Sequence, residues 1–118
     1  MRTIACALGV VALSAVPATE ASAARRVPDP IVGFTFAAGT PSLYAPGQPL
    51  RIRTGDVVVW TNLDPVGHDV SFDVLDFNPQ LGPGESAELA FTRPGHYTYH
   101  CHEHHEIPSM HGLVYVSD

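Results

Sequence analysis

Six of the seven histidines lie in one stretch near the C-terminus, between His96 and His111, together with Cys101 and Met110. A thiolate, several imidazoles and a thioether are ligands that copper accepts in both of its oxidation states. Zinc also binds cysteine and histidine, but a structural zinc site usually contains two or more cysteines, and a catalytic one gains nothing from a thioether. The stretch therefore predicts a copper site.

The elements that must position these residues are short strands. From Ile31 onward, alternating polar and apolar residues are separated by glycine, proline, asparagine and aspartate. This pattern predicts an all-β fold, a Greek-key β-sandwich or barrel of about seven strands. The expected strands cover residues 31–37, 50–53, 56–62, 68–73, 86–92, 96–101 and 112–117.

The same alternation assigns the faces of the strands. Val58 and Trp60 share one face of their strand, which we expect to form part of the core. In the strand that ends at Cys101, Tyr99 and the cysteine share one face, and His100 lies on the other. The sulfur of Cys101 is therefore expected at the inner end of the sandwich, where it is protected from oxygen.

The N-terminus has the features of an export signal. A positive residue, Arg2, precedes the apolar run Ile4–Val16, and a small-residue cleavage site follows. The run is too short to cross a bilayer as a helix, so we expect no membrane insertion after cleavage. The protein is therefore expected to be secreted or periplasmic. The predicted division is a signal peptide over residues 1–23, a flexible leader over 24–30 and one domain over 31–118.

The number of cysteines and the net charge exclude an internal disulfide and two classes of partner. Removal of the signal takes Cys6 away and leaves Cys101 as the only cysteine, which excludes an internal disulfide. The remaining chain has five arginines, no lysine and eleven acidic residues, a net charge of −6 with neutral histidines. Nucleic acids and anionic lipids need clustered basic residues, so neither is expected as a partner.

Several motifs follow one another in a specific order between residues 32 and 116. They are Gly55-Asp56-x-Val58-x-Trp60-x-Asn62, His68 at the start of a strand, Leu81-x-Pro83-Gly84-Glu85, Phe91-Thr92-x-Pro94-Gly95, Tyr97-x-Tyr99-His100-Cys101-x2-His104, and Met110-x-Gly112-x-Val114-x-Val116. In order and spacing the chain resembles the cupredoxins, in particular the small plastocyanin- and amicyanin-like members.

The resemblance implies a set of ligands for one copper ion. His68, Cys101 and His104 correspond to the three close ligands, and Met110 corresponds to the weak axial ligand. Such a set suits neither oxidation state of copper fully, so little rearranges when an electron arrives or leaves. Two alternatives stay open, because Cys101-x3-His105 is also a possible spacing and because Met110 can instead pack in the core.

Other residues depart from the pattern or need a separate interpretation. Asp69 follows His68 where relatives often have asparagine, and a carboxylate close to the sulfur should lower the redox potential.

His96 and His111 are expected to be exposed. His100 and His102 flank the cysteine as in multicopper oxidases, where such histidines bind a second copper between domains. A protein of one domain has no second domain to supply the other histidines of such a centre, unless its subunits assemble into a ring. Strand parity places His100 toward solvent.

These observations predict a monomeric electron carrier rather than an enzyme. It would exchange single electrons with exported redox proteins through the edge of His104. One alternative is copper storage or delivery by the histidine-rich loop. The other is a ring-forming copper oxidase or reductase that uses His100 and His102 between subunits.

Overall fold

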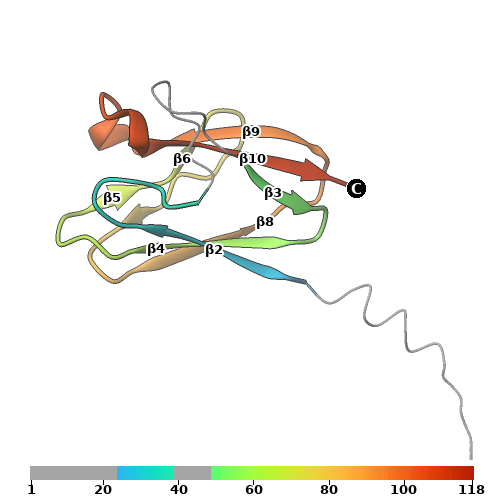
Figure 1. Cartoon of the computed structure of the whole chain (residues 1–118), viewed down its shortest axis with the longest axis horizontal. Coiled ribbons are helices and arrows are strands. Elements are labelled where there is room, and N and C mark those ends of the chain that lie inside the picture. The colour runs from blue at the N-terminus through green and yellow to red at the C-terminus, as the bar shows by residue number, and fades with distance from the viewer. Residues whose placement is uncertain (1–23, 39–48) are drawn as a thin grey trace, which may run out of the picture.

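The computed structural model of the protein describes residues 24–38 and 49–118, and the predicted signal peptide lies outside these ranges. Two β-sheets face each other (Figure 1). The first has the order β2-β4-β8, with β2 (Arg26–Ile31), β4 (Val57–Asn62) and β8 (Ser86–Ala90). The second has the order β3-β10-β9-β6, with β3 (Leu50–Arg53), β10 (His111–Ser117), β9 (Gly95–His100) and β6 (Ser71–Phe72).

A third, small sheet pairs β5 (His68–Asp69) with β7 (Gln80–Leu81). Strand β2 runs parallel to β4 and β3 runs parallel to β10, while the other pairs are antiparallel. The described residues thus contain nine strands, three of them only two residues long. The predicted all-β class is confirmed.

The core lies between the two large sheets and is rich in aromatic rings. Trp60 of β4 contacts Phe72 and Tyr99 edge to face, each at 5.6 Å between ring centroids. The predicted inner-face residues Val58 and Trp60 are both fully buried, as is Cys101. The expected placement of the sulfur inside the sandwich is therefore confirmed.

The prediction of a flexible leader over residues 24–30 is wrong, because β2 begins at Arg26 and pairs with β4 along its whole length. Pro28 and Pro30 are tolerated because β2 is an edge strand, where a missing N–H does not interrupt the sheet. Sequence analysis missed this strand because a core-facing position is occupied by an acidic residue, Asp29, which is fully buried.

Two predicted strands also differ from the structure. Of the stretch 31–37, only Ile31 lies in a strand, as the last residue of β2; the chain then turns back, with a single bridge between Ile31 and Phe36. The stretch 68–73 is divided at Val70 into β5 and β6. The first half pairs with β7 and the second with β9, so the chain changes sheets within a few residues.

This arrangement brings the chemically relevant segments to one end of the sandwich (Figure 1). The connection from β9 to β10 contains Cys101 and two short 3₁₀ turns, η2 (His102–His104) and η3 (Pro108–Met110). Strand β5 packs against η2. Residues separated by more than 30 positions in the sequence therefore meet at this end.

Candidate metal centre

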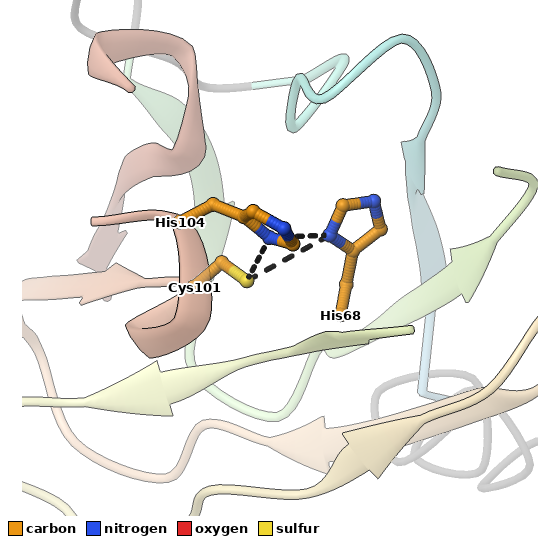
Figure 2. A group of neighbouring side chains, drawn as sticks. All are labelled: His68, Cys101 and His104. Atoms are coloured by element: carbon orange, nitrogen blue, oxygen red, sulfur yellow. Dashed lines mark hydrogen bonds between the residues drawn. The ribbon is translucent and has the colours of Figure 1, made fainter. Parts of the chain in front are cut away.

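Three side chains converge at this end of the sandwich (Figure 2). The Cys101 Sγ atom lies 3.3 Å from His104 Nδ1 and 3.7 Å from His68 Nδ1. The two Nδ1 atoms are 3.2 Å apart. Among the described residues, this is the group of cysteine, histidine and acidic side chains whose ligand atoms lie close enough to hold one metal ion, all within 4.8 Å of one another.

The spacing of these atoms fits a single ion. Donors at about 2.0–2.3 Å around one ion lie roughly 3.5 Å from each other, which matches the separations between the three side chains. One thiolate and two imidazoles form the trigonal donor set of blue copper sites. The residues present therefore fit copper.

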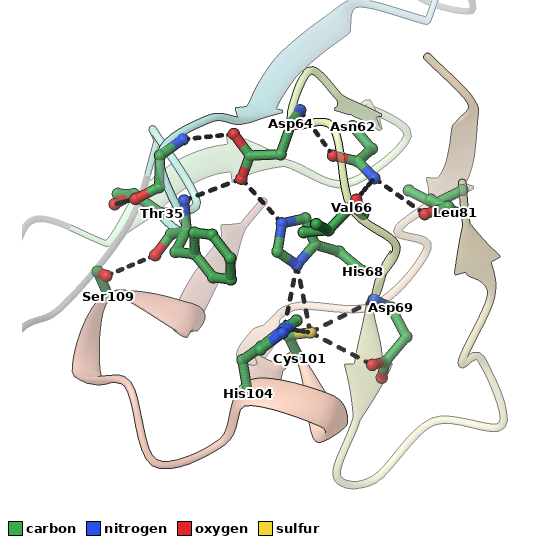
Figure 3. A network of polar contacts seen from close by, with 12 residues as sticks. Thr35, Asn62, Asp64, Val66, His68, Asp69, Leu81, Cys101, His104 and Ser109 are labelled. Atoms are coloured by element: carbon green, nitrogen blue, oxygen red, sulfur yellow. Dashed lines mark hydrogen bonds and ion pairs between the residues drawn. The ribbon is translucent and has the colours of Figure 1, made fainter. Parts of the chain in front are cut away.

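A buried carboxylate orients His68 (Figure 3). Asp64 Oδ2 lies 2.8 Å from His68 Nε2, so the ring donates its Nε2–H to the carboxylate and presents Nδ1 to the site. Burial acts to raise the pKa of Asp64, but hydrogen bonds from the Phe34 N–H, His68 and the Gly33 N–H outweigh it and hold the pKa below its ordinary value. Sequence reasoning missed Asp64; its position four residues before His68 was the available signal.

The Cys101 sulfur has a second carboxylate beside it. Asp69 Oδ1 accepts a hydrogen bond from the thiol at 3.3 Å, and the Asp69 backbone N–H donates to the sulfur at 3.5 Å. Burial raises the pKa of the Cys101 thiol to about 11, and the Asp69 carboxylate adds to the increase. The free thiol is thus protonated at neutral pH, and a metal must displace its proton.

Asp69 is itself held by several donors. Its carboxylate accepts hydrogen bonds from the Ser71 hydroxyl at 2.6 Å, the His102 N–H at 3.0 Å and the Glu103 N–H at 3.3 Å. Burial acts to raise the pKa of Asp69, yet these hydrogen bonds and that of Cys101 keep it below the ordinary value. The side chain does approach the sulfur, and it ties β5 to the turn that follows the cysteine.

Phe34 covers the two histidine rings and was not identified from the sequence. Its ring contacts His68 and His104 edge to face, at 5.1 Å and 4.9 Å between centroids. The backbone of Phe34 has φ of 56°, which is unusual for a residue with a side chain. Two hydrogen bonds to Asp64, from the Gly33 and Phe34 N–H groups, hold this turn. The carboxylate that orients His68 therefore also positions its cover.

The structure brings His104, and not His105, next to the sulfur. His105 is exposed, and its Nδ1 donates to the His102 carbonyl at 3.0 Å. Met110 is fully buried within the core cluster, and its carbonyl accepts the Cys101 N–H at 2.9 Å. The backbone thus places Met110 next to the cysteine.

The remaining histidines lie outside this group. His96, His102 and His111 are exposed, as predicted for His96 and His111. The His100 side chain lies on the outer face of β9, beside Asp73, and is 23% exposed. Its orientation away from the sulfur agrees with strand parity.

Comparisons with known proteins agree with the fold and the site. Residues 39–117 match the sequence profile described as copper binding proteins of the plastocyanin/azurin family. Amicyanin-alpha of Methylorubrum extorquens is 32% identical, with 98% of this chain and 99% of that protein covered. Amicyanin of Paracoccus denitrificans is 33% identical over 57% of this chain and 53% of its own length.

Solved structures of amicyanin are similar as well. The Cu(I) form of one amicyanin mutant has a TM-score of 0.62 at 27% identity, with 80% of this chain and 85% of that chain covered. The reduced state of another has a TM-score of 0.61 at 30% identity, with 78% and 82% covered. The sandwich described above is thus the fold of these amicyanins.

A β-sandwich with one buried thiolate and two imidazoles at its end defines a cupredoxin, a protein that holds a single copper ion. The match over residues 39–117 and the amicyanin relatives make the assignment specific: the chain belongs to the plastocyanin/azurin family of copper-binding proteins. It is a blue copper protein that carries one electron at a time.

Proposed function

We propose that His68, Cys101 and His104 are the close ligands of the copper, with Met110 as the weak axial ligand. Electrons enter and leave through His104, and the partners are other exported redox proteins. The observation that carries the proposal is the convergence of the three donor atoms, with separations of 3.2–3.7 Å. When bound, copper supplies a one-electron couple between Cu(I) and Cu(II).

The chain's own groups keep the ligands in place before and after an electron moves. Asp64 prevents rotation of His68, since its carboxylate is bonded to the Nε2–H at 2.8 Å. Cys101 is enclosed in the core, and its backbone N–H is bonded to the Met110 carbonyl. A site held in this way changes little between oxidation states, which favours fast electron exchange.

His104 supports the proposed route because it reaches the surface. Cys101 is fully buried and His68 is 1% exposed, whereas His104 is half-buried. Three exposed apolar side chains lie in the two loops that carry Phe34 and Asp64 to the site: Val32, Leu63 and Val66. Exposed apolar groups of this kind are suited to brief contacts with a partner.

Burial of the site also favours a carrier over an enzyme. A substrate would need access to the metal, yet Cys101, His68 and Met110 are all buried.

The predicted signal over residues 1–23 supports export. No helix within the described part of the chain is long and apolar enough to span a bilayer.

A titration with Cu(II) tests the ligands. The wild type should bind one copper per chain and develop an intense visible absorption from charge transfer between thiolate and copper. The absorption should be lost in Cys101→Ser and strongly altered in His104→Ala, while His105→Ala serves as the matched control and keeps it. A colourless wild-type complex would overturn the proposal, and so would loss of colour in His105→Ala with its retention in His104→Ala.

Met110→Leu separates axial ligation from core packing. Leucine fills a similar volume, so a core residue would change only the free energy of unfolding, by less than about 1.5 kcal/mol. An axial thioether would also change the reduction potential and the electron paramagnetic resonance spectrum. Unchanged spectra and potential would remove Met110 from the ligand set.

The carrier role is tested with the copper-loaded protein. Reduction by a soluble one-electron donor and reoxidation by an acceptor should be complete and repeatable, without release of copper to a chelator. The mass in solution should be that of a monomer. Rapid transfer of copper to the chelator would support storage or delivery instead, and a ring-shaped oligomer with a second copper type would support an oxidase or reductase.

A further inference from the structure

Four histidines outside the copper site line one open cavity on the outer surface of the sandwich. The group, here called the histidine cluster, comprises His100, His102, His105 and His111 together with Asp73. The cavity is solvent-accessible, with a volume of ≈ 430 Å³. The copper-binding role uses none of these side chains, so their grouping needs a separate explanation.

Strand pairing brings the cluster together. His100 ends β9 and lies directly opposite His111, the first residue of β10. Asp73 follows β6, whose Ser71 pairs with His100, and the Asp73 N–H donates to the Thr98 carbonyl of β9 at 3.2 Å. Facing residues of an antiparallel pair have Cβ atoms only about 5 Å apart. The fold therefore places two imidazoles and a carboxylate side by side, independently of the copper ligands.

The turn after Cys101 adds the other two rings. The His102 ring lies 6.0 Å from that of His100 and 5.9 Å from that of His105. His100 and His111 stack at 5.7 Å, with an angle of 22° between the rings. Two imidazoles on one ion, each bound at about 2.0–2.1 Å, have ring centroids roughly 5 Å apart. The separations in the cluster, 5.7–6.0 Å, are somewhat longer, so these side chains must rotate before they can share an ion.

Hydrogen bonds leave lone pairs free for such an ion. His105 donates its Nδ1–H to the His102 carbonyl at 3.0 Å, and His111 donates its Nε2–H to the His105 carbonyl at 2.6 Å. The other nitrogen of each ring, His105 Nε2 and His111 Nδ1, then has a lone pair. Histidines that bind metals usually donate their second N–H to a carbonyl or carboxylate in this way.

The surroundings carry negative charge. Asp73 Oδ1 lies 3.4 Å from His100 Nδ1. Glu103 and Glu106 are exposed in the same β9–β10 connection, and the chain contains no lysine. Imidazoles with a carboxylate suit zinc, copper(II) and nickel(II). We propose that the histidine cluster is a second metal site, for one exchangeable divalent ion of this kind, separate from the buried copper.

Isothermal titration of Zn(II) into the copper-loaded, oxidised protein tests the site, at about pH 7.5, where an ordinary histidine is mostly neutral. One zinc per chain should bind while the blue absorption persists. The double variant His100→Ala/His111→Ala should weaken zinc binding by at least about tenfold. The retained blue colour of this variant would demonstrate that it is folded.

His96→Ala is the matched control. His96 lies on the same outer face of β9, is exposed and contacts the Tyr115 ring at 4.4 Å between centroids, but lies outside the cavity. Its replacement should leave zinc affinity unchanged. The proposal is overturned if no zinc binds while the blue absorption is intact, if the double variant and the control bind equally, or if zinc bleaches the blue absorption in proportion to binding.

Discussion

Replacement of Asp29 by asparagine should remove a pH dependence from the stability of the protein. Asp29 is fully buried in β2. Its carboxylate accepts the Ala38 N–H at 2.9 Å and the hydroxyl of Tyr99. Burial nevertheless raises the pKa of Asp29 from 3.8 to about 6, because the hydrogen bonds do not fully replace water around the charge.

The sign and size of the effect follow from these two pKa values. Below pH 3.8 the carboxyl is protonated in both the folded and the unfolded chain, and the stability contribution is fully present. As the pH rises toward 6, the unfolded chain loses the proton while the folded chain retains it, so the free energy of unfolding falls. At about 1.4 kcal/mol per pH unit, the total loss is about 3 kcal/mol, and the curve is flat above this window.

Urea unfolding at a series of pH values, in the same metal state for both proteins, measures this contribution. The amide introduced by Asp29→Asn can accept the Ala38 N–H through its oxygen and donate to the Tyr99 oxygen through its NH₂ group. The difference in unfolding free energy, Asp29→Asn minus wild type, should therefore rise by about 2.5 kcal/mol between pH 4 and pH 7. Tyr99→Phe removes a hydrogen bond that lowers the folded-state pKa of Asp29, so the fall in stability should begin at the same pH and extend to higher pH. A difference that is independent of pH would refute the reasoning.

Two further substitutions test the structure around the copper. Asp69→Asn removes a negative charge 3.3 Å from the Cys101 sulfur and should raise the reduction potential, on the order of 100 mV, measured by voltammetry; an unchanged or lower potential would contradict this. Gly112→Ala would place a Cβ atom in steric overlap with the ring of Tyr99, which is buried in the core. We expect a loss of about 1–3 kcal/mol in urea unfolding, and wild-type stability would show that the close approach is not rigid.

Much of the fold could be predicted from local sequence patterns. Alternation of apolar residues identified strands β3, β4, β8, β9 and β10 within one or two residues. It also placed Trp60 in the core and Cys101 on the inner face, because a strand turns successive side chains to opposite sides whatever it pairs with. The donor types between His96 and His111 indicated copper, since ligand preference is a property of the side chains themselves.

Contacts between residues far apart in the sequence could not be predicted from local patterns. The sequence around Asp29 predicted a flexible leader, whereas the structure pairs β2 with β4 and bonds the Asp29 carboxylate to the Tyr99 hydroxyl. The turn at Phe34 covers the site only because Asp64 binds two of its N–H groups. Each of these groups is unfavourable locally, as a buried charge or a strained backbone, and is compensated by a residue about 30 to 70 positions away.

The same distinction applies to the two groups of histidines. Residue types and spacing determined that the chain binds a soft, redox-active metal. Only the tertiary structure brought His104 rather than His105 to the thiolate and joined it there with His68, which comes from the distant strand β5. It also brought His100, His111 and Asp73 to one cavity. Side-chain chemistry is encoded residue by residue, but proximity depends on how the sheets pair and pack.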